Sequence, residues 1–477
     1  MGSTKTPEQI IAAMREIVEN DRILTADEAD RRGFLVDPLG KHLGRPACLV
    51  EPISTLEVSA VVKRLSMTGT PIVPMGGNTG LAGGSVMPDR AAVMISMRRM
   101  DGIEPIPSGA SSVAVASGCI LANLQMAARA ADRLFPLSLT AEGSCQIGGT
   151  IATNAGGINA LRYGTMRDLV LGLEVVLADG RILDMMRSLR KDNAGYDLKH
   201  LFIGSGGTLG IVTRAVLRLF PRVTRSATAL VAIRDAACSL RLLADMREMF
   251  GERLTSCELI DRARLALVLR HDSAARSPFA DPPAFVVLLQ LDGNDADTGL
   301  ETELEEFLAA KLECGLCDDA VVAQSSSQSE ALWHLRHALG HVLRPAGLRF
   351  SHDISVPVEA QADYVEEVVR SIARSWPEAI VRIYGHLGDG NLHTIICFPD
   401  RKQGDDPSGG IRRQIDEAID HIVMAFGGSV TAEHGIGSSY IGRLVATRSS
   451  DELNTMRAIK TALDPNDVMN PGKIFAP

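Results

Sequence analysis

The sequence predicts a protein of the α+β class that is built from two domains. Its 477 residues exceed what one simple core usually organises, and 45% apolar with 22% charged residues is an ordinary globular composition. The 44 glycines gather in loops between short strands in the first half of the chain, whereas longer amphipathic helices alternate with strands in the second half. The pattern changes after Pro221, where we place the domain boundary.

The first part of the chain begins with a helical lead, residues 1–45, in which Thr6-Pro7 marks a helix start. Residues 46–221 then form the first domain. There, helical spacing in "TLEVSAVVKRLSMTG" precedes two short strands, "PIVPM" and "AAVMIS", on either side of a glycine loop. Further along, "LGLEVVLADGRILD" predicts a hairpin that turns at Asp179-Gly180.

The second domain covers residues 222–435 and has longer helices. "ETELEEFLAAKL" and "DYVEEVVRSIARSW" have helical periodicity, and strands such as "AFVVLLQL" and "DISVPV" lie between them. Residues 436–477 form a C-terminal segment, which is a helix followed by a proline-containing tail. We find no internal repeat in the sequence.

Charge and composition exclude several classes of partner. A net charge of −9, a pI near 5.7 and the lack of a long Lys/Arg block argue against nucleic acid. The best apolar run, "LVLGLEVVLADG", contains Glu174 and is too short to span a membrane. The N-terminus resembles a charged helix more than a signal peptide, so we expect a cytoplasmic protein. The eight scattered cysteines, including Cys314 and Cys317, predict free thiols.

The stretch "YGHLGDGNLHTIICF", residues 384–398, predicts a β-hairpin that carries two histidines. Asp389-Gly390 favours a two-residue turn, and both flanks are rich in β-branched and aromatic residues. With this turn His386 lies opposite His393, with Cβ atoms roughly 5 Å apart on one face. That separation suits two ligands of one metal ion, but an isolated histidine pair is more often structural, so a third ligand is needed.

Two glycine-rich loops in the first domain predict an anion site. "PMGGNTGLAGG" and "AEGSCQIGGTIATNAGG" let the backbone approach a ligand closely and direct its N–H groups toward it, as a phosphate or pyrophosphate requires. A third segment, "IGSGGTLGIV", adds to them, and together they suggest a long ligand held at several points. Neither loop is a P-loop or a dinucleotide fingerprint, which disfavours nicotinamide.

Five motifs in order resemble a known family: "GSCQIGGTIATNAGGINALRYGTMRDLVLGLEVVLADGRIL", "GYDLKHLFIGSGGTLGIVT", "GHLGDGNLH", "AEHGIG" and "NPGKIF". They resemble FAD-linked dehydrogenases of the vanillyl-alcohol-oxidase class, in the D-lactate, glycolate and D-2-hydroxyglutarate dehydrogenase branch. The resemblance covers nearly the whole chain beyond the N-terminal helices. It implies a two-part FAD-binding domain of the vanillyl-alcohol-oxidase type, an α/β cap domain for the substrate, and a C-terminal segment that returns to the FAD domain.

The resemblance also implies which residues contact FAD. They are Gly76, Gly77, Asn78, Thr79, Gly80, Leu81, Gly148, Gly149, Thr153, Asn154, Gly157, Gly210, Ile211, Val212 and Asn470. The first loop has no His or Cys that could attach flavin. Cys145 lies in the second loop, but similar proteins that share "GSC" bind FAD without a covalent bond, so we expect dissociable FAD.

The third metal ligand comes from "SVTAEHGIG", because Glu433 completes a set of two histidines and one carboxylate. In similar dehydrogenases, the positions of His386, His393 and Glu433 bind metal. Zinc is the expected ion, although the same set holds Mn or Fe. His434 is the candidate general base, and its alternative role is to support the metal site.

Two further residues complete the candidate catalytic set. Arg336, in "EALWHLRHALG", matches the arginine that similar enzymes place in the substrate pocket, and its alternative is an ordinary ion pair. Asn391 follows the hairpin turn and is assigned to the catalytic set with it. Where D-2-hydroxyglutarate dehydrogenases carry Lys and Thr, this chain has Ser351 and Gly340, so the sequence does not support recognition of a second, distal carboxylate there. His352 is the candidate substitute, although no sequence feature supports that role.

Two departures from the pattern lie outside the predicted substrate pocket. Gly206 stands where relatives commonly carry Glu, and Tyr440 where many carry Lys. They weaken the transfer of residue roles in their neighbourhood.

We therefore expect an FAD-dependent, metal-assisted dehydrogenase of D-2-hydroxy acids, of the D-lactate or D-2-hydroxyglutarate type, with a non-NAD electron acceptor. A quinone, a cytochrome or an electron-transfer flavoprotein would fit as acceptor, and the family suggests a homodimer. Two alternatives remain. One is a catalytically silent flavin-binding subunit of a glycolate-oxidase-like complex, and the other is a metal-dependent hydrolase, which leaves the glycine loops unexplained.

Overall fold

The structure is a computed structural model that describes residues 6–87, 92–341, 347–402 and 404–476. The chain divides into two compact units. Unit 1 consists of Met1–Gly157, Gly164–Arg222 and Glu433–Pro477, and unit 2 consists of Ile158–Tyr163 and Val223–Ala432. No helix in the described ranges is both long and apolar enough to cross a membrane.

Unit 1 contains a four-stranded sheet in the order β1-β2-β4-β3. The strands are β1 (Ile23–Thr25), β2 (Cys48–Val50), β3 (Ile72–Met75) and β4 (Val93–Ser96). β2, β4 and β3 run parallel, and their short apolar sequences are typical of strands buried on both faces. β1 joins antiparallel from within the region that we expected to be helical.

A second sheet of unit 1 has the order β5-β9-β7-β8 and is antiparallel. Its strands are β5 (Ser112–Ala116), β7 (Val170–Val176), β8 (Ile182–Met185) and β9 (Ile211–Arg218), and a separate pair joins β6 (Arg133–Leu134) to β10 (Phe220–Pro221). The predicted hairpin is β7–β8, with Gly180 at a φ of +85° in its loop. Positive φ at this position explains the glycine of the Asp-Gly pair.

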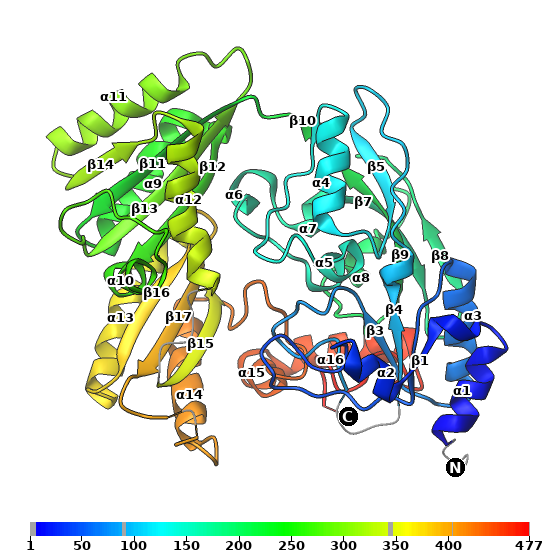
Figure 1. Cartoon of the computed structure of the whole chain (residues 1–477). Coiled ribbons are helices and arrows are strands. Elements are labelled where there is room, and N and C mark those ends of the chain that lie inside the picture. The colour runs from blue at the N-terminus through cyan, green and yellow to red at the C-terminus, as the bar shows by residue number, and fades with distance from the viewer. Residues whose placement is uncertain (1–5, 88–91, 342–346, 403, 477) are drawn as a thin grey trace. The chain divides into compact units, whose positions relative to one another are not determined.

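Helices cover these sheets (Figure 1). In chain order the helices of unit 1 are α1 (Pro7–Arg15), η1 (Asn20–Arg22), α2 (Ala26–Arg31), α3 (Thr55–Ser66), η2 (Met97–Arg99), α4 (Leu121–Ala130), α5 (Ile147–Thr153), α7 (Met166–Leu169), α8 (Lys199–Phe202), α15 (Ile441–Thr447) and α16 (Ser450–Leu463). After α16 the chain bonds to β3, where Met469 forms a parallel bridge with Ile72. This return brings the C-terminal segment into the core of unit 1.

Unit 2 is built on a seven-stranded antiparallel sheet in the order β14-β11-β13-β12-β16-β17-β15. The strands are β11 (Arg225–Ile233), β12 (Leu254–Asp261), β13 (Phe285–Gly293), β14 (Asp319–Val322), β15 (Leu348–Ser355), β16 (Ile380–His386) and β17 (Asn391–Phe398). The helices are α6 (Ala160–Tyr163), α9 (Ala236–Phe250), η3 (Gly251–Arg253), α10 (Arg262–His271), α11 (Leu300–Glu313), α12 (Ser326–His341), η4 (Val358–Ala360), α13 (Gln361–Ser375) and α14 (Gly410–Ala425).

Helices pack on both faces of this sheet (Figure 1). Alternate residues of the central strands enter two separate cores. Leu259 of β12 joins the core formed with α9, α11, α13 and α14, while its neighbour Ile260 joins the core formed with α10 and α12. Period-two alternation in a sheet buried on both sides explains this division. The α10/α12 face is the one that carries the candidate site.

Candidate active site

The register of the histidine hairpin corrects the sequence prediction. His386 of β16 pairs with Asn391, and His393 of β17 pairs with Tyr384. The connection is therefore the four residues 387–390, two more than Asp389-Gly390 alone. A shift of two residues preserves the face, because side chains alternate with a period of two. His386 and His393 are thus diagonal neighbours on one face, with ring centroids 5.9 Å apart.

Each histidine has a carboxylate near its Nδ1. Glu258 Oε1 lies 2.7 Å from His386 Nδ1, and Asp353 Oδ1 lies 3.6 Å from His393 Nδ1. Both carboxylates come from adjacent strands, since Glu258 of β12 pairs with His386 and Asp353 of β15 pairs with His393. A carboxylate that accepts from Nδ1 fixes the tautomer in which Nε2 is a metal ligand.

Glu433 is positioned by the chain that precedes it. Ser429 and Ser355 exchange two backbone hydrogen bonds of 2.8 and 3.0 Å, so this chain runs along the end of β15. The Ala432 N–H then donates to the Asp353 carbonyl oxygen at 3.2 Å. Glu433 is the next residue. Its carboxylate therefore lies near Asp353, the β15 residue that pairs with His393.

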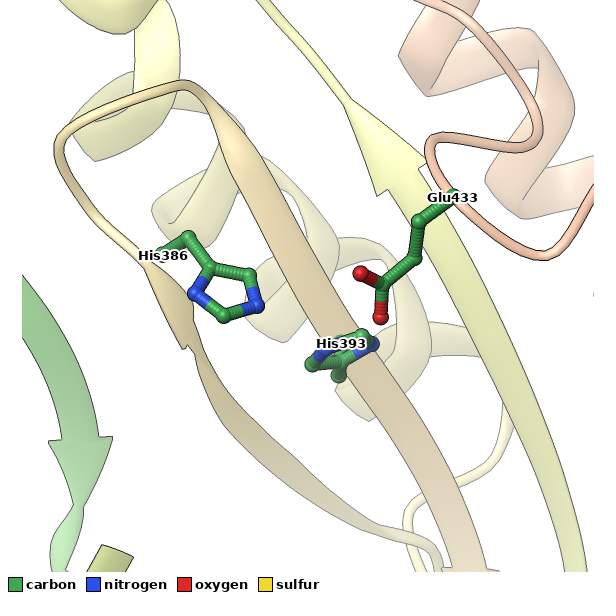
Figure 2. Close-up of side chains that lie close together, drawn as sticks. All are labelled: His386, His393 and Glu433. Carbon is green, nitrogen blue, oxygen red and sulfur yellow. The ribbon is translucent and has the colours of Figure 1, made fainter. Parts of the chain in front are cut away.

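The three predicted metal ligands come together. One ligand atom from each of His386, His393 and Glu433 lies within 4.8 Å of the other two. Figure 2 shows the two imidazoles on the hairpin strands and the Glu433 carboxylate pointing toward them. Two imidazoles and one carboxylate, with carboxylates behind the imidazoles, form a donor set that fits a divalent transition metal such as zinc.

Arg336 belongs to the same network. Its Nε donates to Glu258 Oε2 at 2.6 Å, so Glu258 bridges the candidate substrate arginine and a metal ligand. Glu258 is fully buried. Burial alone would raise the pKa of Glu258, but His386 and Arg336 together hold that pKa below its ordinary value. The guanidinium of Arg336 also lies over the Tyr384 ring, 5.4 Å from its centroid.

Asn391 and His434 occupy different kinds of position. The Asn391 amide donates to Asp353 Oδ1 at 2.9 Å and to the Ile354 carbonyl at 2.8 Å, which ties β17 to β15. These contacts position the strands that carry the ligands. His434 is partly exposed, and its Nε2 lies 3.7 Å from Glu433 Oε1.

His352 is wrong as a substitute cation for this site. It pairs with Thr394, one position away from the Asp353–His393 pair, so its side chain points to the opposite face of the sheet. There its Nε2 lies 2.7 Å from Asp416 Oδ1 of α14. Ser351 does lie on the metal-ligand face, two residues before Asp353.

The two glycine loops of unit 1 touch each other. A Cβ at Gly77 would lie 2.1 Å from the Ser144 carbonyl oxygen, and a Cβ at Gly76 would lie 3.4 Å from Gly149. Glycine at Gly77 is therefore required by backbone contact. Asn78, with a φ of +51°, bonds through its side chain to Val36 and Ser85, which fixes the loop after the contact.

A pocket opens beside this contact. Its lining includes six of the predicted cofactor residues together with several neighbours: Gly76, Gly148, Gly149, Gly210, Ile211 and Val212. The buried Ser117 Oγ also lines it and has no hydrogen-bond partner among the described residues. An orphaned hydroxyl beside closely approaching glycines fits a phosphate-bearing ligand such as FAD.

The remaining predicted cofactor residues surround the same region of unit 1. Asn470 donates to the Gly84 and Gly206 carbonyls at 3.0 and 2.8 Å, while its buried Oδ1 has no partner in the described structure. Thr153 ends α5, and Asn154 follows in the left-handed conformation. The others lie in the loops after β3 and α5: Thr79, Gly80, Leu81 and Gly157.

Glu258, Asp353 and Ser117 were not predicted from the sequence. Glu258 is the one charged residue in the strand sequence "LTSCELI", and a carboxylate in such a strand is a detectable sign of a buried polar role. Asp353 lies within the quoted "DISVPV" but has no partner visible in the sequence. Ser117 has no distinguishing local pattern.

Comparisons with known proteins agree with this architecture. Residues 46–186 match the FAD binding domain, and residues 221–474 match the C-terminal domain of FAD linked oxidases. The fold resembles p-cresol methylhydroxylase with a TM-score of 0.75 and 16% identity, covering 100% of this chain and 98% of that one. It also resembles alkyldihydroxyacetonephosphate synthase with a TM-score of 0.74 and 18% identity, covering 99% and 86%.

Several curated proteins are similar along most of their length. A probable mitochondrial D-2-hydroxyglutarate dehydrogenase of Oryza sativa is 38% identical, covering 96% of this chain and 79% of the relative. A D-2-hydroxyglutarate dehydrogenase of Xanthomonas citri is 34% identical, with 98% and 96% covered. A putative mitochondrial D-lactate dehydrogenase of Schizosaccharomyces pombe is 32% identical, with 98% and 90% covered.

The chain has a two-domain FAD-binding fold like that of p-cresol methylhydroxylase. The chain belongs to the FAD-linked oxidase family, and the predicted fold class is confirmed.

Proposed function

We propose that the protein oxidises a D-2-hydroxy acid to the 2-oxo acid and passes the electrons to an acceptor other than NAD. The single observation that carries this proposal is the convergence of His386, His393 and Glu433 in a chain that also matches an FAD-binding domain. The names of similar proteins, D-2-hydroxyglutarate and D-lactate dehydrogenases, support the substrate class. The lack of a nicotinamide fingerprint supports the choice of acceptor.

Each part of the reaction can be assigned to residues of the chain. The glycine loops around Gly77 and Gly149 would hold FAD, which would supply the hydride acceptor. His386, His393 and Glu433 would hold a divalent cation, which would supply Lewis acidity. The Arg336 guanidinium pairs with the substrate carboxylate, as a planar bidentate donor can.

His434 accepts the proton of the substrate hydroxyl. Imidazole is a side chain suited to general-base catalysis, and His434 Nε2 lies 3.7 Å from Glu433 Oε1. Loss of one hydroxyl proton and one hydride converts the hydroxy acid into the oxo acid, so the electrons and protons balance. We expect His434→Ala to slow flavin bleaching by about a hundredfold or more.

FAD is proposed to be dissociable. The one cysteine in the loops, Cys145, is buried, and burial raises the pKa of its thiol to about 11, which leaves little thiolate for attack on flavin. Acid precipitation should therefore release the yellow colour into the supernatant. Colour that stays with the precipitate would contradict this part of the proposal.

Zinc is the proposed metal. Two imidazoles and a carboxylate with an open fourth position are typical of catalytic zinc, and manganese or iron are the alternatives. Metal analysis of protein purified without added metal should find about one zinc per chain. Removal by a chelator should stop the bleaching of flavin by substrate, and re-addition of zinc should restore it.

The decisive experiment is anaerobic. The visible spectrum of the purified protein is recorded, and D- and L-lactate, D- and L-2-hydroxyglutarate, D-malate and glycolate are then added one at a time. Bleaching by D isomers alone is the expected result. A yellow protein that no acid bleaches after zinc or manganese is restored would favour a silent flavin-binding subunit, and a colourless active protein would favour a metal-dependent hydrolase.

A further inference from the structure

A buried arginine on the metal-ligand face has no part in the chemistry described so far. Arg382 of β16 lies two and four residues before Tyr384 and His386, so all three side chains point to the same face. Arg382 is only 8% exposed. Nevertheless its Nε has no hydrogen-bond partner, and it forms no ion pair with any carboxylate of the described residues. Burial raises the pKa of Asp261 and the charge of Arg382 opposes this rise, but no carboxylate oxygen of the described residues contacts the guanidinium. A buried guanidinium N–H without an acceptor is destabilising unless a ligand supplies one.

The nearby carboxylates are already engaged. Glu258 accepts from Arg336 and faces His386. Asp261 accepts the backbone N–H groups of Ile383 and Arg264, the latter at 2.6 Å, because it caps the start of α10. Neither carboxylate forms a salt bridge with Arg382 within the described chain.

Three arginines, Arg264, Arg336 and Arg382, are buried on this side of the sheet. Burial lowers the pKa of Arg264, Tyr384 and Asp261 oppose this shift, and Arg382 and Arg336 add to it. The other carboxylates of the face, Asp353 and Glu433, lie beside the metal-ligand histidines. Among the described residues, none of these carboxylates forms a salt bridge with Arg382.

Arg264 is the less available of the two arginines that lack a carboxylate partner. Its Nη2 donates to the Leu339 carbonyl at 2.7 Å, and its guanidinium stacks over Tyr384 at 4.6 Å from the ring centroid. It is 2% exposed. Arg382 makes neither kind of contact in the described structure, so its guanidinium is the better candidate for a ligand.

The place of Arg382 on β16 indicates which part of a bound substrate would reach it. Tyr384 pairs with His393, and Arg382 lies one same-face step further along β16, roughly 7 Å from that row. Ser351 lies in the same row as Arg382, because both flank Ile395 of β17. The row thus holds an arginine beside the serine that stands where we expected a lysine.

We propose that Arg382 binds a second carboxylate, distal to the hydroxyl carbon, and so selects 2-hydroxy dicarboxylic acids over monocarboxylic ones. This inference rests on the proposed function, since the metal-ligand residues and Arg336 hold the other end of the substrate. Arg382 is in this sense a specificity-determining residue and takes no part in proton or hydride transfer.

The test compares two acids of equal length on the holoenzyme. D-2-hydroxyglutarate has the distal carboxylate, and D-2-hydroxyvalerate has a methyl group in its place. Arg382→Met should raise the KM for D-2-hydroxyglutarate about tenfold to a hundredfold, the range for a lost charge-assisted hydrogen bond, and change the KM for D-2-hydroxyvalerate less than about twofold. Arg382→Lys should keep most of the preference, and the exposed Arg374→Met serves as the matched control.

Equal losses on the two acids, or an unchanged KM for the diacid, would overturn the assignment. If Arg382→Met does not fold, Arg382→Gln keeps similar length and polarity without charge and is expected to give the same split between the two acids.

A second measurement separates this inference from the proposed function. Glutarate has no hydroxyl to oxidise, and its binding is measured by calorimetry against valerate, which has one carboxylate. Binding of glutarate that Arg382→Met weakens about tenfold or more would support the anion site even if no hydroxy acid bleaches the flavin. Glutarate binding that is the same in wild type and Arg382→Met, or absent in both, would reject it.

Discussion

At the scale of single residues, Glu258 connects the two ends of the candidate site. It faces His386 Nδ1 at 2.7 Å and accepts from Arg336 Nε at 2.6 Å. One carboxylate thus fixes the tautomer of a metal ligand and neutralises the arginine proposed to hold the substrate carboxylate. Because Glu258 is fully buried, water does not readily take its place as the partner of His386 and Arg336.

Glu258→Gln should lower zinc affinity about tenfold to a hundredfold, the range for losing a carboxylate behind a ligating histidine. Glutamine keeps the shape of the side chain but is a weaker acceptor for His386 Nδ1–H. Competitive titration of zinc against a chromophoric chelator measures the change without reference to turnover.

The control for Glu258→Gln is Glu252→Gln, an exposed position in the same unit. It should bind zinc like the wild type. FAD content should stay unchanged in both variants, since FAD belongs to unit 1. Wild-type zinc affinity in Glu258→Gln would show that the carboxylate does not support the metal site.

The sequence was informative about residues with local patterns and silent about residues defined by distant partners. His386 and His393 flank an Asp-Gly turn, and Glu433 lies in a motif shared with a family, so all three could be predicted. Glu258 lies 128 residues before His386, and only the pairing of β12 with β16 brings them together. Arg382 could be noticed as a charge in an apolar strand, but only the structure shows that its buried Nε has no hydrogen-bond partner among the described residues.

At the scale of elements, the hairpin β16–β17 determines how the ligands face each other. The sequence predicted the hairpin and the shared face, but placed the histidines directly opposite each other, whereas a four-residue loop makes them diagonal. Turn length depends on contacts outside the hairpin. Val356 N–H donates to the Gly390 carbonyl at 3.1 Å, and the Gln361 amide donates to the Leu387 carbonyl at 2.8 Å. These partners cannot be identified from the hairpin sequence.

Gly390→Ala should disturb this loop and the metal site with it. Gly390 has a φ of +86°, and an added Cβ would lie 2.3 Å from the Val356 carbonyl oxygen. The left-handed conformation alone costs an alanine about 1–2 kcal/mol, and the backbone clash adds to this. We expect a lower free energy of unfolding for unit 2, measured by urea denaturation with tryptophan fluorescence, together with a reduced zinc content.

Gly404→Ala is the matched control for Gly390→Ala. Gly404 is exposed in the same unit, and a Cβ there meets nothing within 4 Å. Its unfolding free energy should change by less than about 0.5 kcal/mol. If both alanine variants had the same stability and zinc content, the loop geometry would not control the site.

At the scale of the whole molecule, the FAD-binding unit is assembled from both ends of the chain. Asn470 reaches Gly84 and Gly206, and Lys473 Nζ donates to the Val86 carbonyl at 2.6 Å across 387 residues of sequence. The sequence analysis predicted the return of this segment only through the family resemblance. Composition and periodicity describe neighbours along the chain, and they contain no information about a contact of this separation.

Lys473 should make the stability of unit 1 depend on pH. It is 4% exposed, and burial lowers the pKa of its ammonium group to about 8 from an ordinary 10.5. Below pH 8 both states are protonated, and the folded protein bears the cost of a buried charge. Between pH 8 and 10.5 the folded state releases its proton first, so the unfolded state binds more protons and this group's contribution to stability rises by about 3 kcal/mol.

Lys473→Met removes both the charge and this pH dependence. At pH 7 the variant should have a higher free energy of unfolding than the wild type, because no charge is buried. Loss of the hydrogen bond to Val86 reduces this difference. The difference should fall by about 3 kcal/mol between pH 7 and pH 10.5. Urea denaturation followed by FAD release reports on unit 1, where the site lies. The exposed Lys191→Met should show no such change between the two pH values. A constant difference between Lys473→Met and wild type across this range would mean that Lys473 keeps its proton in the folded protein, with the Val86 carbonyl compensating for its burial.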